Sequence, residues 1–310
     1  MTVADWLLES DPSIGWQAVR DLFDAPADDV ANERARVAHE GWGAWLLARQ
    51  QPDGHWGDDA SNPEWATHWA LALLREIGLD PTSREARRAA GLVDAHIGWH
   101  WWGKRFFEGE VEPCINGRVL AVGAYFGRDV RTLAERLLGE QMEDGGWNCE
   151  QENGSTRGSF HSTINVLEGL LEHECASGAT AEVTAARERG QDYLLERRLL
   201  RRRSTGELID PAFTELGYPY GYHYDVLRGL DYLREAGVPP DERMSEAIDA
   251  VVSKRGPDGR WPLENRHDVE GDMCLPPTVI DLLSELGEAD ARPSTWITLR
   301  ALRVLRWAGR

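Results

Sequence analysis

Lysine is almost absent from this sequence. Lys104 and Lys254 are the only two among 310 residues, arginine supplies nearly all of the positive charge, and the formal net charge is −19. Because phosphate backbones bind to basic surfaces, this excess of acid argues against nucleic acid as a partner.

Long apolar runs are also missing. No stretch approaches the roughly 20 residues that a transmembrane helix needs. The first residues, MTVADWLLESDPS, are acidic and do not have the basic-then-apolar order of a signal peptide. We therefore expect a cytoplasmic protein without a transmembrane segment. Its four cysteines, at positions 114, 149, 175 and 274, are then expected to be thiols or metal ligands rather than disulfides.

Familiar catalytic signatures are absent as well. The sequence has no glycine-rich phosphate loop of the Walker or dinucleotide type and no Gly-x-Ser-x-Gly nucleophile elbow. These absences argue against nucleotide-binding and serine-hydrolase classes. What the chain does have is tryptophan, with 14 residues.

The tryptophans occur in a repeated turn. QQPDGHWG (50–57), QMEDGGWN (141–148) and RGPDGRWP (255–262) each place an Asp-Gly turn one residue before a tryptophan and close an amphipathic helical segment. Apolar helices are expected after them, at 63–78, at 160–173 and, delayed, at 294–309. Two degenerate copies precede apolar helices expected to begin at Pro113 and at Tyr222 (222–237).

This regular spacing predicts the fold. The helices expected to begin at Pro63, Pro113, Phe160 and Tyr222 start 50, 47 and 62 residues apart, which indicates an array of helical hairpins. Amphipathic helices that alternate with apolar ones suggest an outer and an inner layer. We predict an all-α, closed (α/α) toroid of about five to six hairpins over residues 35–310, with residues 1–34 as a helical leader packed on the barrel. An open α-solenoid is the alternative.

At this point the chain resembles the α/α-toroid superfamily of terpenoid cyclases, of the squalene–hopene type, and protein prenyltransferases. The turns around Trp56 and Trp147 resemble the Gln-Trp repeats of that superfamily. The resemblance implies the fold more than the activity, because one toroid serves several functions. The cyclase Asp-x-Asp-Asp motif is absent; the nearest sequence offers only Asp58 and Asp59.

The prenyltransferase branch matches a longer stretch. Its zinc-bearing subunits carry Asp-x-Cys at the start of an inner helix, then a Gly-Gly turn, then an aromatic-His pair. The resemblance therefore implies zinc bound by Glu112, Cys114 and His161. Cys149, just past the Trp147 turn, is a possible fourth ligand, but a position on a loop is the favoured interpretation. It also implies that two basic residues just upstream, Lys104 and Arg105, contact a diphosphate. A second Asp-x-Cys, at Asp272-Met273-Cys274, is interpreted as coincidence.

Elementary chemistry agrees with this ligand set. Pro113 suits the first turn of a helix, so Cys114 should lie at a helix N-terminus, which stabilises the thiolate that binds metal. Glutamate, cysteine and histidine leave one zinc position open, as in catalytic sites. The alternative is that Cys114 and His161 are buried packing residues.

Other candidates line the predicted cavity. His223 and Asp225 are the candidate catalytic pair for a cyclase with a non-standard acid. His68, Trp102 and Tyr222 are candidate substrate contacts, because aromatic rings can hold an apolar chain or a cation. The same rings could instead fill grooves between helices.

The sequence thus predicts a terpenoid cyclase-like or prenyltransferase-like enzyme with a central apolar cavity, dependent on zinc and acting on an isoprenoid or similar apolar molecule. The alternatives are a cyclase with a non-standard acid and a noncatalytic toroid that binds lipid or peptide. A partner subunit is left open.

Overall fold

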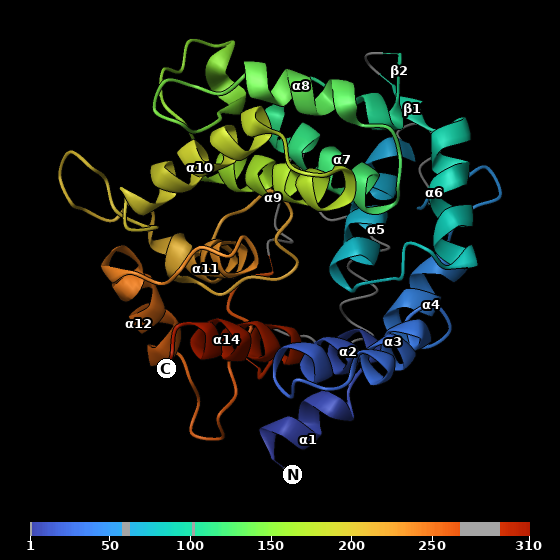
Figure 1. The fold of residues 1–310 in the computed structure, drawn as a ribbon, viewed down its shortest axis with the longest axis horizontal. Helices are drawn as coiled ribbons and strands as arrows, with labels where there is room; N and C mark the ends of the chain where they lie inside the picture. Colours follow the sequence, from blue (N-terminus) through green and yellow to red (C-terminus); the bar gives the residue numbers. More distant parts are fainter. Residues whose placement is uncertain (1, 58–62, 101–102, 267–291) are drawn as a thin grey trace.

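The computed structural model of the protein describes residues 2–57, 63–100, 103–266 and 292–310. Helices make up most of this structure (Figure 1). The α-helices are α1 (Val3–Leu8), α2 (Pro12–Asp21), α3 (Ala27–Arg36), α4 (Gly41–Ala48), α5 (Pro63–Glu76), α6 (Arg84–His96), α7 (Pro113–Tyr125), α8 (Arg131–Gly139), α9 (Phe160–Ser177), α10 (Ala181–Leu195), α11 (Val226–Glu235), α12 (Ser245–Ser253) and α14 (Thr295–Trp307). The short elements are β1 (Gly98–Trp99), β2 (Lys104–Arg105), η1 (Phe106–Glu108), η2 (Cys149–Gln151), η3 (Pro211–Thr214) and η4 (Glu242–Met244).

The helices are arranged as a ring in two layers, which confirms the predicted toroid. Helices α5, α7, α9, α11 and α14 form the inner wall, and the helices that precede them along the chain lie outside (Figure 1). Helix α2 closes the ring between α14 and α5. The Arg303 guanidinium donates to Gln17 Oε1 at 3.0 Å, and the Trp16 indole donates to the carbonyl of Ile77 at 2.9 Å. The N-terminal segment thus supplies part of the ring.

The repeated tryptophans fasten the outer helices to the inner ones. Each indole is fully buried and donates its N–H to a carbonyl near the end of the preceding outer helix: Trp56 to Leu46, Trp147 to Leu137 and Trp261 to Val251. Each backbone N–H of these tryptophans donates to a threonine hydroxyl of the next inner helix: Thr67, Thr163 and Thr298. Each of these turns therefore connects an outer helix to the next inner helix through the hydrogen bonds of its tryptophan.

Helices α7 and α9 pack at very close range. A Cβ atom on Gly117 of α7 would lie only 2.5 Å from the backbone carbon of Asn165 on α9, so a side chain at this position would push the helices apart. Glycine therefore permits the approach. As a result, Cys114, one turn before Gly117, lies beside the first turn of α9.

The inner helix expected at 222–237 begins later than predicted, at Val226, because Asp225 caps its N-terminus. Residues 217–225, here called the tyrosine segment, run irregularly into the barrel. Gly221 has a φ of 54° in the left-handed region, and Pro219 precedes it, so a helix cannot continue through them.

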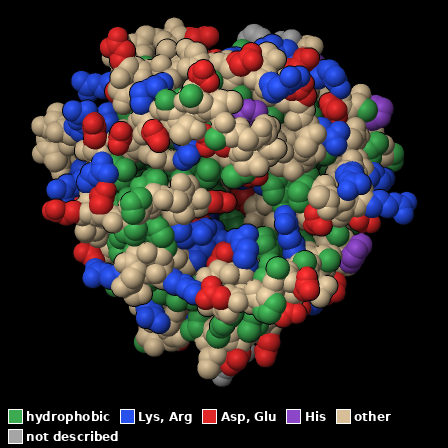
Figure 2. Space-filling view, in the orientation of Figure 1, with side chains coloured by type: hydrophobic (Ala, Val, Ile, Leu, Met, Phe, Trp, Pro, Cys, Tyr) green, Lys and Arg blue, Asp and Glu red, His purple; other side chains and the backbone are tan. Residues whose placement is uncertain are grey.

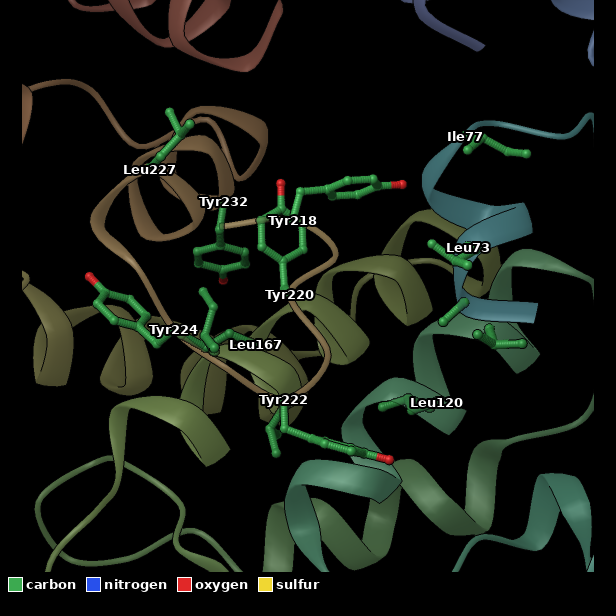
Figure 3. Packing of buried hydrophobic residues seen from close by; sticks show 14 of the residues in the cluster. Leu73, Ile77, Leu120, Leu167, Tyr218, Tyr220, Tyr222, Tyr224, Leu227 and Tyr232 are labelled. Carbon is green, nitrogen blue, oxygen red and sulfur yellow. The ribbon is translucent and has the colours of Figure 1, made fainter. Parts of the chain in front are cut away.

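The tyrosine segment fills the middle of the barrel. Its tyrosines, Tyr218, Tyr220, Tyr222 and Tyr224, are all buried. Figure 3 shows Tyr222 and Tyr224 pointing to opposite sides of the segment. Side chains of inner helices donate hydrogen bonds to three backbone carbonyls of this segment: Arg118 to Gly221, Asn165 to Tyr222 and Arg228 to His223.

None of the described helices combines the length and the apolar character needed to cross a membrane.

Candidate functional site

Two sulfurs and a carboxylate meet where α7 begins. Cys114 Sγ lies 2.8 Å from Cys149 Sγ and 3.4 Å from Glu112 Oε2. Ligand atoms of these three residues all lie within 4.8 Å of one another, and no other group of three or more such residues does so in the described parts of the chain. We call Glu112, Cys114 and Cys149 the thiol cluster.

The loop before α7 is fixed by its neighbours. Asn116 accepts from the backbone N–H of Glu110 at 2.7 Å and donates to its carbonyl at 3.2 Å. The Arg136 guanidinium of α8 donates to the carbonyls of Glu110 and Val111. These contacts hold Glu112 at the helix N-terminus, next to the Cys114 thiol.

Cys149 reaches the cluster through the tryptophan turn. It follows the anchored Trp147 by two residues and lies in η2. Its backbone N–H donates to the Ser162 hydroxyl of α9 at 3.3 Å, and its sulfur lies 3.3 Å from the same oxygen. The sequence analysis named Cys149 only as a possible fourth ligand. Its position two residues after Trp147, in one of the turns that connect an outer to an inner helix, could have identified it as a stronger candidate.

The two thiols differ in acidity. The hydrogen bond between the two sulfurs lowers the pKa of the Cys149 thiol, and the hydrogen bond with Ser162 lowers it further. The pKa of Cys114 is raised by its hydrogen bond with Cys149, by burial and by the neighbouring Glu112. Cys149 is therefore the more acidic of the two thiols, and the Cys114 sulfur also contacts the Glu112 side chain.

This donor set suits a thiophilic divalent ion. Zinc binds thiolates and carboxylates in four-coordinate sites, and three protein ligands leave one position open. Two zinc-bound sulfurs lie roughly 3.8 Å apart in tetrahedral geometry, since each Zn–S bond is about 2.3 Å. The sulfurs of Cys114 and Cys149 would therefore separate by about 1 Å on binding.

The structure does not bring His161 into the thiol cluster. Its Nδ1 accepts the backbone N–H of Tyr224 at 2.9 Å, and its ring lies 5.5 Å from Phe213 and 5.6 Å from His223 between centroids. The pKa of His161 falls to about 4, because of burial and the neighbouring His223 and Arg228 charges. A neutral imidazole here orients the tyrosine segment.

Tyr222 and His68 stack against each other inside the barrel, with ring centroids 5.8 Å apart. The His68 Nε2 accepts from the Arg118 guanidinium at 3.3 Å, and burial holds the pKa of His68 well below its usual value. The Tyr222 hydroxyl is buried without a hydrogen-bond partner among the described residues. Burial raises its pKa, and the nearby Cys114 and Glu112 charges raise it further.

Asp225 is held as a helix cap. Its Oδ1 accepts the backbone N–H of Arg228 at 2.8 Å, and its Oδ2 accepts that of Gly217 at 3.2 Å. It is 1% exposed, and burial raises its pKa to about 6. His223, the other half of the predicted pair, lies at the same end of the barrel and gives its carbonyl to Arg228.

Lys104 and Arg105 form strand β2 on the outer side of the ring. Arg105 is exposed and forms an ion pair with Asp94 of α6 at 2.9 Å. The predicted contact Trp102, together with Asp58, Asp59 and the second Asp-x-Cys at 272–274, lies outside the described residues. Phe106 and Phe107 are buried and pack edge to face.

The centre of the ring holds a charged cavity of about 300 Å³ (Figure 2). Its charged lining consists of Arg20, Arg34, Arg75, Arg234, Arg300, Arg303, Glu76, Glu168, Glu172, Asp231 and Glu235. We call it the arginine cavity. The prediction of an apolar central cavity is wrong for this space. The charged residues come largely from the C-terminal halves of inner helices, and the tyrosine segment occupies the apolar middle.

The sequence matches no protein-family model and no curated protein. Among solved structures, a protein from Actinoplanes is 16% identical over 97% of this chain and 91% of its own, with a TM-score of 0.47. The type II terpene cyclase MstE from Scytonema is 16% identical over 99% of this chain and 88% of its own, with a TM-score of 0.47. An MstE variant with its substrate, geranylgeranyl dihydroxybenzoate, is 16% identical over 96% and 86%, with a TM-score of 0.45.

Proposed function

We propose that the chain is a zinc-dependent enzyme on a terpenoid cyclase-like toroid, with Glu112, Cys114 and Cys149 as its metal ligands. The observation that carries this proposal is the meeting of three ligand-type groups within 4.8 Å of one another. Cys114 is buried, Glu112 and Cys149 are half-buried, and all three are residue types that ligate zinc once deprotonated, so a divalent ion would be held by two sulfurs and a carboxylate.

The residues around the cluster support a catalytic rather than a purely structural ion. Three protein ligands leave a position for a substrate atom. When bound, zinc acts as a Lewis acid that lowers the pKa of a coordinated thiol or water. The Tyr222 hydroxyl stays protonated because its pKa is raised, and it has a hydrogen to donate. Ser162 holds the Cys149 sulfur in place.

The substrate that we propose for the metal centre is an isoprenoid-like apolar molecule, transferred or cyclised there. This part depends on the sequence motifs alone. Because the tyrosine segment fills the barrel behind the cluster, the substrate would reach the metal from the rim where α7 and α9 begin. Lys104 and Arg105 remain the proposed diphosphate contacts.

Metal content tests the proposal. Purified, reduced protein loaded with zinc and then desalted should retain about one ion per chain. Cys114→Ser should lose it, whereas Cys175→Ser, at an exposed cysteine outside the cluster, should keep it. Turnover of polyprenyl diphosphates should disappear with the metal. A wild-type protein that binds no zinc would overturn the proposal and leave a noncatalytic binding toroid as the better reading.

A cyclase that uses Asp225 as its acid is the second candidate. One observation favours it: burial raises the pKa of this carboxyl to about 6, which keeps part of it protonated near neutral pH. Asp225→Asn in a squalene or polyprenyl cyclisation assay tests it, since loss of turnover in a folded variant that keeps its zinc would support the acid role.

A further inference from the structure

The arginine cavity contains two buried atoms of charged side chains to which no described residue forms a hydrogen bond. Arg300 Nη1 and Glu76 Oε2 are both buried without a hydrogen-bond partner among the described residues, and both residues line the cavity. A buried polar atom without a hydrogen bond is costly even when the rest of its charged group has a partner, so such atoms call for an explanation. These two have opposite charges and share one space.

Arg300 lies in a cationic neighbourhood. It is 6% exposed, and its Nε donates to Asp231 at 2.7 Å. The same carboxylate also pairs with Arg234 and Arg303, so three guanidinium groups share one carboxylate. Burial and the Arg303 charge lower the pKa of Arg300 to about 9. The surroundings therefore favour an added anion at Arg300.

Glu76 has one carboxylate oxygen, Oε2, without a hydrogen-bond donor among the described residues. It is the last residue of α5, and its Oε1 is 3.7 Å from Arg118 Nη2, beyond ordinary hydrogen-bond distance. Burial raises the pKa of Glu76 on balance, although the nearby Arg118, Arg228 and Arg75 charges oppose that shift. A donor with positive charge would satisfy this carboxylate.

We propose that the arginine cavity binds a small zwitterion of the amino acid class, whose carboxylate contacts Arg300 and whose ammonium group contacts Glu76. An anion alone would leave Glu76 unsatisfied, and a cation alone would leave Arg300 unsatisfied. A cavity of about 300 Å³ accommodates a molecule of this size. The Tyr220 ring, 4.1 Å from the Arg300 guanidinium, forms part of the wall.

This site is separate from the thiol cluster. Cys114 lies in the first turn of α7, whereas Tyr125, the last residue of the same helix, lines the arginine cavity. The tyrosine segment lies in the middle of the barrel. The inference therefore does not require the proposed metal activity.

A homologous series of ω-amino acids tests the proposal. Glycine, β-alanine, γ-aminobutyrate and ε-aminocaproate are titrated into the full chain by calorimetry, with acetate and methylammonium as the two half-ligands. We expect one chain length to bind at least about tenfold more tightly than either half-ligand, because it reaches both charged groups at once. The preferred length then reports the separation of the two contacts.

Two variants assign the contacts. Arg300→Gln should abolish binding of the zwitterion and of acetate. Glu76→Gln should weaken the zwitterion about tenfold or more and leave acetate binding unchanged. The matched controls are Arg203→Gln and Glu196→Gln, which alter an exposed ion pair outside the cavity and should bind as the wild type does. Circular dichroism and thermal unfolding establish that each variant folds; if Arg300→Gln does not, Arg300→Lys replaces it and should bind acetate more weakly.

Several results would overturn the proposal. If no member of the series bound to the wild-type protein, water alone would fill the cavity. If Glu76→Gln bound the zwitterion as tightly as the wild type does, Glu76 would not be the contact of the ammonium group. The titration is repeated on Cys114→Ser, where the zwitterion should bind unchanged, so a failure of the metal proposal is distinguishable from a failure here.

Discussion

The two ends of the barrel use buried polar side chains in opposite ways. Where α7 and α9 begin, two cysteine sulfurs and the Glu112 side chain meet, and the cluster contains no cation. Where the inner helices end, guanidinium groups and carboxylates largely pair, and one atom of each sign is left over, at Arg300 and Glu76. The charge that each end lacks indicates its ligand: a metal cation at the first and a zwitterion at the second.

The largest expected effect comes from Arg228, which links the two ends. Its fully buried guanidinium holds the carbonyl of His223 in the tyrosine segment and pairs with Glu168, which lines the arginine cavity. Arg228→Met should cost about 3–5 kcal/mol in the free energy of unfolding, because it removes a fully buried guanidinium that pairs with Glu168 and donates to Asn165 and His223. Urea denaturation measures the loss. Adding Glu168→Gln should restore part of it; a loss below about 1 kcal/mol would mean that the ends are not linked in this way.

Asp225 should make the free energy of unfolding depend on pH, with a total change of about 3 kcal/mol. Its folded pKa of about 6 lies above the ordinary aspartate pKa of 3.8, so the folded state holds the proton more tightly than the unfolded chain does. The contribution to stability is full below the unfolded pKa and is lost as pH rises through the folded pKa. The stability of the wild type relative to Asp225→Asn should therefore fall by about 3 kcal/mol between pH 3 and pH 7. A difference that is constant with pH would contradict this.

Gly117 tests whether close packing of α7 and α9 builds the metal end. Gly117→Ala should destabilise the protein by about 1–3 kcal/mol, because its Cβ would lie 2.5 Å from the Asn165 backbone. It should also weaken metal binding more than zwitterion binding. The matched control is Gly91→Ala on α6, where a Cβ meets nothing within 4 Å; helix propensity there favours alanine by about 0.5–1 kcal/mol.

The smallest effect is expected at Arg105. Its ion pair with Asp94 is exposed, so Arg105→Ala should change the free energy of unfolding by less than about 1 kcal/mol. Metal content should be unchanged. If Arg105 contacts a diphosphate, the variant should raise KM for a polyprenyl diphosphate; an unchanged KM would remove that role.

The architecture could be predicted because it depends on local chemistry repeated along the chain. The Asp-Gly turns before Trp56 and Trp147 have the same hydrogen bonds in both copies, and Pro113 begins α7 as expected. Glu112 and Cys114 are neighbours in sequence, so their meeting follows from the helix start alone. Cys149 could not be placed in the same way, because its approach depends on how tightly α7 and α9 pack.

The interior was harder to predict. Helical periodicity favoured a helix from Tyr222, although Pro219 and Gly221 already argued for an irregular segment before it. The charged cavity also had a signal: Glu168 and Glu172 are four residues apart on α9, which places both on one face. The sequence does not show that this face points to the centre of the ring, because the helix is mostly apolar and its orientation is set by packing against other helices.

The choice of the third metal ligand tests the account most directly. Reduced, metal-free protein is titrated with Co²⁺, and the near-ultraviolet sulfur-to-cobalt charge-transfer absorption is recorded for wild type, Cys149→Ser and His161→Ala. We predict full absorption for wild type and His161→Ala, and reduced or absent absorption for Cys149→Ser. Unchanged absorption and affinity in Cys149→Ser, with loss of binding in His161→Ala, would contradict the thiol cluster as the metal site.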